Sequence, residues 1–415
     1  MGETTPATFE GSVGGQARKG VRKLPKSGTG ILSGHIKQVK NLKEMMANFQ
    51  FSTPTKIFLS IFLLPLFTTV GLTQPRDKFE PLQWKNPFQP DAVDKAIETG
   101  MKFLLKNQKA DGAIYDRGNP IAITALSLMS LAAVGHLPIH PNEKGEAMAK
   151  ALDFILLKKN QNEMGYFGKD GGRMYGHGIV TLTLAEMLGM GMDQEMDKLI
   201  REKCQKAIDL IVRSQKVKKN QSQQGGWRYS PDARDADLSV TIWQLMALRS
   251  AKNSGLDVTS SAISDAVEYL KRSYKSKLDE QGNPINKKSG FAYQPGGHPE
   301  YATTAAGLLA MQVCGQYESP FVLGAADWLL ENVPQTNRKF FFYGTYYYAQ
   351  ALYQRGDEHA KKARKLVEEI LLPMQKQNGS WQGGGSEAGA GEVYCSSMAI
   401  LALAVKYHYL PIYQR

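Results

Sequence analysis

Two aspartates, Asp235 and Asp237, stand directly ahead of an apolar run that begins at Leu238. A carboxylic acid that its surroundings keep neutral can donate a proton to a substrate. A carboxylate at the start of a helix instead accepts backbone N–H bonds and is stabilised by the helix dipole. Asp237 and Asp235 are therefore candidate catalytic acids, with helix capping by Asp237 as the alternative.

Other aromatic and titratable residues stand at equivalent places, close to the start of further apolar runs. The candidates for a pocket are Tyr175, His177, Tyr229, His298, Glu300, Tyr301, Tyr343, Tyr346, Glu392 and Cys395, with Arg173 and Tyr394 nearby. If the helices that follow run parallel, these residues meet at one mouth, where ligands usually bind. Each also has a structural alternative, such as capping for His177, an exposed loop position for His298 and packing for Cys395. Their spacing matches no metal motif, so we predict neither a metal nor a cofactor.

From Asp91 onward the chain repeats itself six times, and each unit holds an amphipathic helix, a Gly-rich loop and a second, more apolar helix. A helix with one apolar face buries that face only, whereas a helix that is apolar all round must be enclosed. The pattern predicts an all-α fold over residues 91–415, an (α/α)6 toroid in which six inner helices lie inside six outer ones.

The loops between paired helices share a Q-x-x-x-G-x-W spacing. It is complete in the third unit at Gln221, Gly225 and Trp227, and in the sixth at Gln375, Gly379 and Trp381. Glycine permits the positive φ that ends a helix, glutamine can satisfy free groups at a helix end, and the aromatic ring can pack between outer helices. We expect these residues to be structural.

Those two motifs resemble the QW repeat of squalene and oxidosqualene cyclases, and the six helix pairs resemble the toroid that these enzymes share with protein prenyltransferase β subunits. The resemblance covers about residues 90–415 and implies a single barrel, whereas the cyclases join two. Class II cyclases protonate an alkene or epoxide with the middle aspartate of Asp-x-Asp-Asp. The resemblance gives Asp237 that role, as in a mutase-like isomerase, but Leu238 replaces the last aspartate of the motif.

The N-terminal region is a candidate export or anchoring signal. Residues 57–72 are apolar or small and follow Lys56, which suits a signal peptide better than a membrane span of about 20 residues. We interpret 1–44 as a disordered basic tail or a mis-annotated start, 45–72 as a signal peptide or membrane anchor, and 73–90 as a linker. The protein is therefore expected to be exported, to the periplasm or outside the cell, or anchored to a membrane.

Net charge excludes one class of partner. Of the formal charge of +12, residues 1–44 carry +5 and residues 73–415 carry +6, with acids and bases mixed on helix faces. We therefore predict no nucleic-acid partner. Three functions stay open for a small-molecule ligand: an isoprenoid cyclase, a carbohydrate-active hydrolase or lyase, and a binding protein without catalysis. The sequence does not decide whether the chain is an enzyme.

Overall fold

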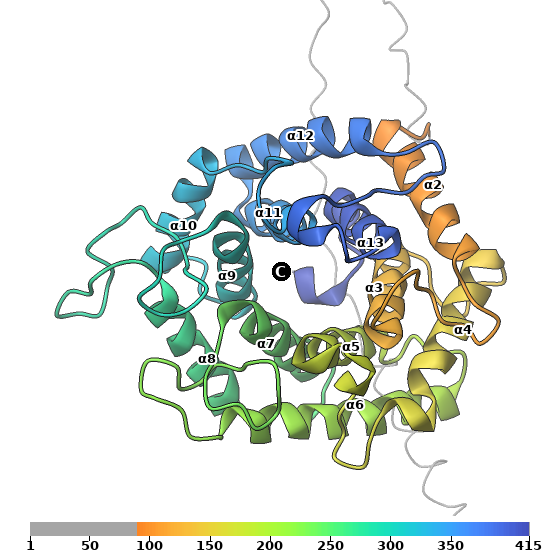
Figure 1. Cartoon of the computed structure of the whole chain (residues 1–415), viewed down its shortest axis with the longest axis horizontal. Helices are drawn as coiled ribbons and strands as arrows, with labels where there is room; N and C mark the ends of the chain where they lie inside the picture. The colour runs from red at the N-terminus through yellow and green to blue at the C-terminus, as the bar shows by residue number, and fades with distance from the viewer. Residues whose placement is uncertain (1–88, 415) are drawn as a thin grey trace, which may run out of the picture. The chain divides into compact units, whose positions relative to one another are not determined.

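The computed structural model describes residues 89–414, which form two concentric rings of helices (Figure 1). The inner ring contains α3 (Pro120–Ala132), α5 (Arg173–Met187), α7 (Leu238–Asn253), α9 (Tyr301–Val313), α11 (Phe341–Arg355) and α13 (Glu392–Leu403). The outer ring contains α2 (Ala92–Lys106), α4 (Glu143–Leu156), α6 (Gln194–Gln215), α8 (Ser260–Ser273), α10 (Pro320–Glu331) and α12 (Asp357–Met374). The expected all-α toroid of six helical hairpins is confirmed for this part of the chain.

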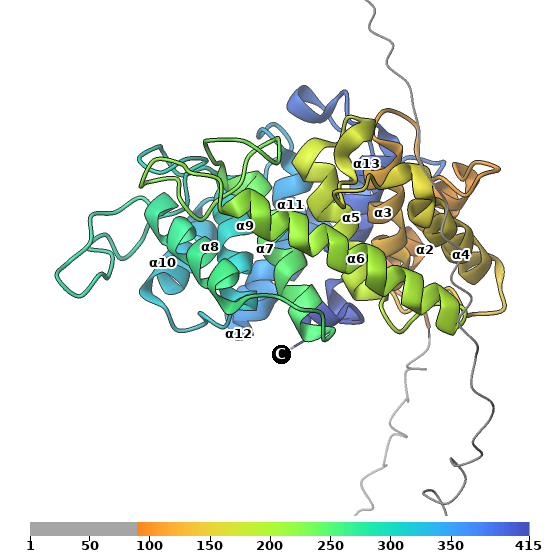
Figure 2. The same cartoon turned by 90° about the horizontal axis from the view of Figure 1, so that it is seen from below.

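Side-chain composition explains which helix joins which ring. All thirteen residues of the inner helix α9 are buried. In the outer helix α12 only Ala363, Val367 and Leu371 are buried, out of eighteen residues. Figure 2 shows the outer helix α6 lying across the inner helices α5 and α7, which it contacts. The apolar residues of the outer helices therefore cover the inner ring, and their charged faces meet solvent.

The rings close because the sixth repeat packs against the first. Between α13 and α3, the hydroxyl groups of Ser397 and Ser127 lie 3.2 Å apart, and Ser130 Oγ donates to the carbonyl of Ser397 at 3.0 Å. In the outer ring, Gln375 Nε2 donates to the carbonyl of Ala96 at 2.8 Å. Closure joins residues nearly 300 positions apart, as the distance of 279 positions between Gln375 and Ala96 shows.

Four loops use the same glutamine bridge to hold neighbouring outer helices together. Each glutamine amide donates to a glycine carbonyl in its own loop and to a carbonyl of the next outer helix, at 2.8 to 3.0 Å. The bridges are Gln108 to Gly112 and Ala147, Gln161 to Gly165 and Lys203, Gln215 to Gly225 and Ala262, and Gln375 to Gly379 and Ala96. The loop motif thus links consecutive repeats through these glutamine bridges.

In the third repeat this role belongs to Gln215, which corrects the assignment of Gln221 from spacing. Gln221 is exposed on the loop, while Gln215 is buried at the end of α6, ten positions before Gly225. The loop is longer here because residues 216–220 are inserted between Gln215 and the turn at 221–225. Lys219 holds this insertion against the end of α6, since its Nζ donates to the carbonyls of Ser214 and Gln215.

The two tryptophans of the motif pack between the rings. Trp227 and Trp381 are almost fully buried, and the indole nitrogen of each donates to an outer-helix carbonyl at 2.8 Å, to Ile211 and Leu371 respectively. The buried polar atom of each ring is therefore satisfied while its apolar body fills the space beneath the loop.

The glutamine bridge predicts that Gln215→Ala destabilises the protein by about 1–3 kcal/mol, because two buried carbonyls lose their donor. The matched variant Gln221→Ala, in the same loop but exposed, should change stability by less than about 0.5 kcal/mol. Urea unfolding of the two variants measures both values. Equal losses would contradict the assignment of the bridge to Gln215.

Candidate functional site

A cavity of about 470 Å³ opens at the end of the ring where the inner helices begin. Its volume falls within the range of about 300–1,000 Å³ that is usual for small-molecule sites. Its larger side chains are Ile123, Leu126, Tyr175, Ile179, Tyr229, Trp243, Tyr343, Tyr394 and Met398, with glycines and Arg173 at the rim. None of the lining residues carries a carboxylate, and Arg173 is the only charged one. The cavity is therefore mainly aromatic and aliphatic.

The C-terminal residues close the opposite end of the inner ring and form the floor of the cavity. Trp243 lines the cavity and stacks on Tyr346, with ring centroids 6.3 Å apart. On its far side Tyr346 contacts Tyr413, hydroxyl to hydroxyl. Tyr413 belongs to the short helix η5 (Pro411–Tyr413), which Figure 1 shows in violet within the inner ring.

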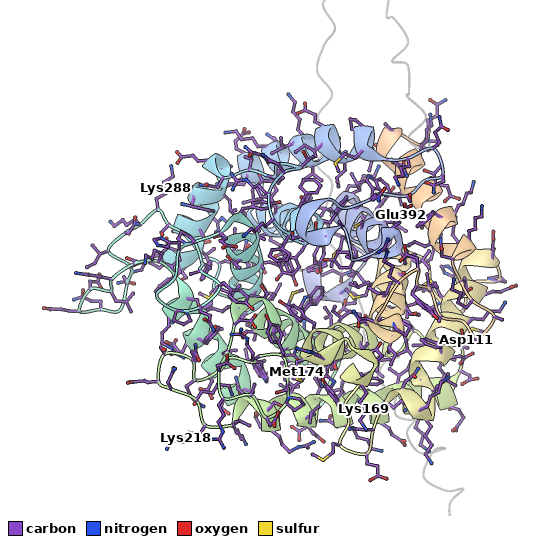
Figure 3. The ribbon with its side chains drawn as sticks, in the orientation of Figure 1. Asp111, Lys169, Met174, Lys218, Lys288 and Glu392 are labelled. Carbon is purple, nitrogen blue, oxygen red and sulfur yellow. The ribbon has the colours of Figure 1, made fainter. Side chains whose placement is uncertain are left out.

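The expected convergence of inner-helix N-termini is present in part, since no residue of α9 and only Trp243 of α7 line the cavity. The cavity is lined by the first turns of α3, α5 and α13 and by Tyr343 at the start of α11. In Figure 3, Met174 and Glu392, from the first turns of α5 and α13, lie toward the inner ring, while Lys218 and Lys288 point outward from peripheral loops. One ligand can thus contact several repeats.

Three of the ten predicted pocket residues, Tyr175, Tyr229 and Tyr343, line the cavity, and the other seven do not. His298 and Glu300 are exposed on the loop ahead of α9. Their position just before α9 in the sequence predicted that they lie at the mouth, but neither residue lines the cavity. Trp243 is a lining residue that the sequence analysis missed, because it lies inside the helix rather than ahead of it.

Tyr301 and Tyr346 are buried inside the ring wall. The hydroxyl of Tyr301 lies 3.1 Å from Thr345 Oγ1, so it joins α9 to α11. Tyr346 faces the floor, as described above. Some aromatic residues in this region therefore line the cavity, and others pack between helices.

Glu392 and Cys395 of α13 also have structural partners. Glu392 forms an ion pair with Lys376 at 2.8 Å and accepts from Ser380 Oγ at 2.6 Å; these two bonds lower the pKa of its carboxyl. Cys395 is fully buried, and desolvation raises the pKa of its thiol to about 12. A thiol in that state is a poor nucleophile.

His177 occupies a position that a hydroxyl residue fills in other repeats. Its Nδ1 accepts from Phe167 N at 3.3 Å, as Thr124, Thr241, Thr304 and Ser396 accept from the corresponding loop amide. Nε2 then carries the proton and lies 3.2 Å from the carbonyl of Ala207. Burial lowers the pKa of His177 to about 4, so the ring is neutral at pH 7. It is positioned to join the loop to α5, behind the cavity wall.

Asp237 caps α7, where its Oδ1 accepts from Val240 N at 2.9 Å. The carboxyl is fully buried, and desolvation raises its pKa to about 6, against the lowering effects of the Val240 amide and of Arg228. Within residues 89–414 Oδ2 has no hydrogen-bond partner, but it lies 3.3 Å from Arg228 Nε. Asp237 does not line the cavity, which separates it from any ligand held there.

Asp235 shares the same arginine. Its Oδ2 lies 3.1 Å from Arg228 Nη1, and its side chain is half exposed. The guanidinium also lies over the ring of Tyr229, 4.7 Å from its centroid, and the hydroxyl of Tyr229 contacts that of Tyr293 at 2.6 Å. Both aspartates therefore belong to a cluster around Arg228 beside the cavity.

Three further acids at the mouth cap inner helices of neighbouring repeats. Asp170 accepts from Ile121 N at the start of α3, Glu387 from Phe342 N and Tyr343 N at the start of α11, and Asp116 from Glu392 N and Val393 N at the start of α13. Buried helix N-termini carry unsatisfied donors and partial positive charge, so carboxylates gather there for structural reasons. Sequence reasoning missed these pairs because each joins two different repeats.

Comparison with solved structures shows the fold. The α-1,6-mannanase GH76A of a Salegentibacter strain is similar with a TM-score of 0.52 and 9% identity, over 77% of this chain and 100% of the mannanase. An inactive variant of that enzyme in complex with α-1,6-mannotetrose gives 0.53, over 76% and 99%. The type II terpene cyclase MstE from Scytonema, in complex with geranylgeranyl dihydroxybenzoate, gives 0.48 at 17% identity, over 77% and 98%.

At 9% identity the likeness to the mannanase concerns architecture alone. No protein-family model and no curated protein matches the sequence.

The predicted N-terminal signal or anchor, residues 57–72, lies outside the described residues. Within 89–414 no helix is both long and apolar enough to cross a membrane. The same part of the chain holds no group of three His, Cys, Asp or Glu side chains arranged to bind a metal ion.

Proposed function

We propose that the toroid binds an apolar small molecule of the isoprenoid class in the mouth cavity, and that it does so without a catalytic acid. The observation that carries this proposal is the lining itself: aromatic rings and aliphatic side chains surround about 470 Å³, and no carboxylate faces it. Burial of apolar ligand surface against such walls is the main favourable term in binding.

The two enzymatic alternatives need carboxylates that reach the ligand. Cyclisation of the expected kind needs an acid in contact with the alkene, but Asp237 caps α7 behind the wall. Glycoside hydrolysis needs two carboxylates about 5–10 Å apart across the scissile bond. The acids near the mouth, Asp116, Asp170 and Glu387, are held as helix caps. A carbohydrate remains the second candidate ligand, because the tyrosine rings at the rim offer flat faces for a sugar.

Binding can be tested by titrating farnesol and an α-1,6-mannooligosaccharide while following tryptophan fluorescence, since Trp243 lines the cavity. We expect farnesol to bind and the sugar not to. Ala390→Trp, at the rim of the cavity, should weaken farnesol binding about tenfold or more by filling the entrance. Ala388→Trp, in the same loop but outside the cavity lining, should bind normally.

Saturable binding of the sugar alone would replace this proposal with the carbohydrate one. Loss of binding in both tryptophan variants would show that the loop, rather than the cavity, is responsible.

We also propose that residues 45–72 export the protein or hold it at a membrane. The N-terminal sequence of the mature native protein tests this: a start just after residue 72 supports cleavage, and a membrane-bound full-length chain supports anchoring. A full-length chain free in the cytoplasm would overturn both.

A further inference from the structure

We propose that the ligand of the mouth cavity carries an anionic head group, a carboxylate or a phosphate, which binds at the N-terminus of α5 to Arg173. This inference rests on the proposed function and adds to it the chemical class of one end of the ligand. Three features of the cavity support this inference, and a purely apolar ligand would engage none of them.

The first feature is the start of α5, which differs from the other helix starts around the cavity. Carboxylates cap α3, α7, α11 and α13, whereas no side chain caps α5. Asp170 is the nearby acid, and its two oxygens are held by the amides of Ile121 and Gly172, just before the helix. Among the described residues, the amides of Arg173 and Tyr175 find no acceptor. Free amides and the helix dipole together favour an anion there.

The second feature is Arg173 itself. It is the only charged residue that lines the cavity, it is exposed at the rim, and it forms no ion pair with any described residue. Its backbone has φ of 50°, a left-handed conformation that is rare for residues with a side chain. Gly171, with φ of 102°, and Gly172 precede it, and both line the cavity without a side chain between the backbone and a ligand. An exposed guanidinium group can donate two parallel hydrogen bonds to a carboxylate or a phosphate.

The third feature is the hydroxyl of Tyr343, which points independently to a polar ligand atom. Tyr343 lines the cavity and is only 8% exposed, yet its hydroxyl has no hydrogen-bond partner among the described residues. Ser239 and Tyr347 lie near without reaching hydrogen-bond geometry. Tyr343 lines the same cavity as Arg173 and Tyr175 of the first turn of α5, so one ligand can contact all three. A buried hydroxyl without a partner is unfavourable unless a ligand supplies one.

The test compares three ligands with the same chain: farnesyl monophosphate, farnesoic acid and farnesol. With the wild-type protein at low salt, at least one anion should bind about tenfold more tightly than the alcohol. Raising the salt concentration should reduce this preference, because the arginine is exposed. The phosphate and the acid, measured separately, distinguish the two head groups.

Arg173→Gln should abolish the preference for anions, so that within this variant the anions bind no more tightly than farnesol, and Tyr343→Phe should weaken anion binding several-fold. Arg234→Gln is the matched control: Arg234 is also an exposed arginine at the mouth, but it does not line the cavity. Equal binding of all three ligands would overturn this inference and leave the proposed function intact. If none of them binds, the proposed function fails as well. An anion preference that survives Arg173→Gln would place the head group elsewhere.

Discussion

The free energy of unfolding of the Glu186→Gln variant should depend less on pH than that of the wild-type protein. The difference should be about 3 kcal/mol between pH 4.5 and pH 7. Glu186 lies near the floor of the inner ring and is 2% exposed. It accepts a hydrogen bond from Ser250 Oγ and another, at 3.1 Å, from Ile412 N. Desolvation outweighs these two bonds and raises the pKa of the carboxyl from 4.5 to about 7.

The sign follows from proton binding. Between pH 4.5 and pH 7 the folded protein keeps a proton on Glu186 that the unfolded chain releases. Protonated Glu186 therefore makes its full contribution to the free energy of unfolding below pH 4.5, and this contribution is lost as the pH rises toward 7. Glutamine stays neutral and can still accept from Ile412 N while donating to Ser250, so the fold should be retained.

Chemical denaturation at several pH values measures the effect as a difference between wild type and variant. Other groups titrate in the same range, such as Asp237 with a pKa of about 6, and they cancel in that difference. The matched control is Glu202→Gln on the exposed side of α6, which should leave the slope unchanged. Parallel curves for wild type and Glu186→Gln would contradict a buried, protonated Glu186.

The partners of Glu186 give the C-terminal segment a structural role that its sequence, YHYLPIYQR, does not reveal. Ile412 and Tyr413 are buried, and Gln354 Nε2 donates to the carbonyl of Tyr413 at 2.8 Å. The segment closes the floor beneath Trp243 and Tyr346. Ionisation of Glu186 should therefore loosen the floor before it affects the rest of the ring.

The sequence predicted the architecture because the two kinds of helix differ in composition. A run such as YATTAAGLLAMQV, with no charged residue, can only be an enclosed helix, and α9 is buried along its whole length. Six such runs alternating with amphipathic ones leave the closed double ring as the arrangement that buries every apolar face.

The site was harder to predict because position near the mouth does not determine where a side chain points. His177 looked like a binding residue, but alignment of the repeats with one another would have matched it to Thr124 and Thr241 and indicated a structural bond. Gln221 fitted the motif by spacing, while the bridge uses Gln215 because the loop is longer. The caps supplied by Asp116 and Asp170 depend on contacts between repeats, which local patterns do not encode.

Gly225→Ala should be among the most damaging single substitutions in the toroid, with a loss of about 3 kcal/mol or more. Gly225 has φ of 89°, and a Cβ built there would overlap the carbonyl oxygen of Asp265 in α8. The left-handed conformation alone accounts for about 1–2 kcal/mol. To relieve the overlap, either α8 moves outward, which breaks the buried bond from Gln215 to Ala262, or the loop shifts, which breaks the buried bond from Gln215 to Gly225. Either loss costs about 1–3 kcal/mol because a buried partner is left unsatisfied.

Gly255→Ala separates these two contributions. Gly255 also has a positive φ, of 73°, but a Cβ there meets nothing within 4 Å, so only the backbone conformation is penalised. Urea unfolding should show about 1–2 kcal/mol for Gly255→Ala and clearly more for Gly225→Ala. Similar losses would mean that α8 accommodates the methyl group and that the close approach is unimportant. Gly112, Gly165 and Gly379 also have a positive φ, and a Cβ at each would meet a backbone carbonyl of an outer helix. The result therefore applies to all four glutamine bridges that hold neighbouring outer helices together.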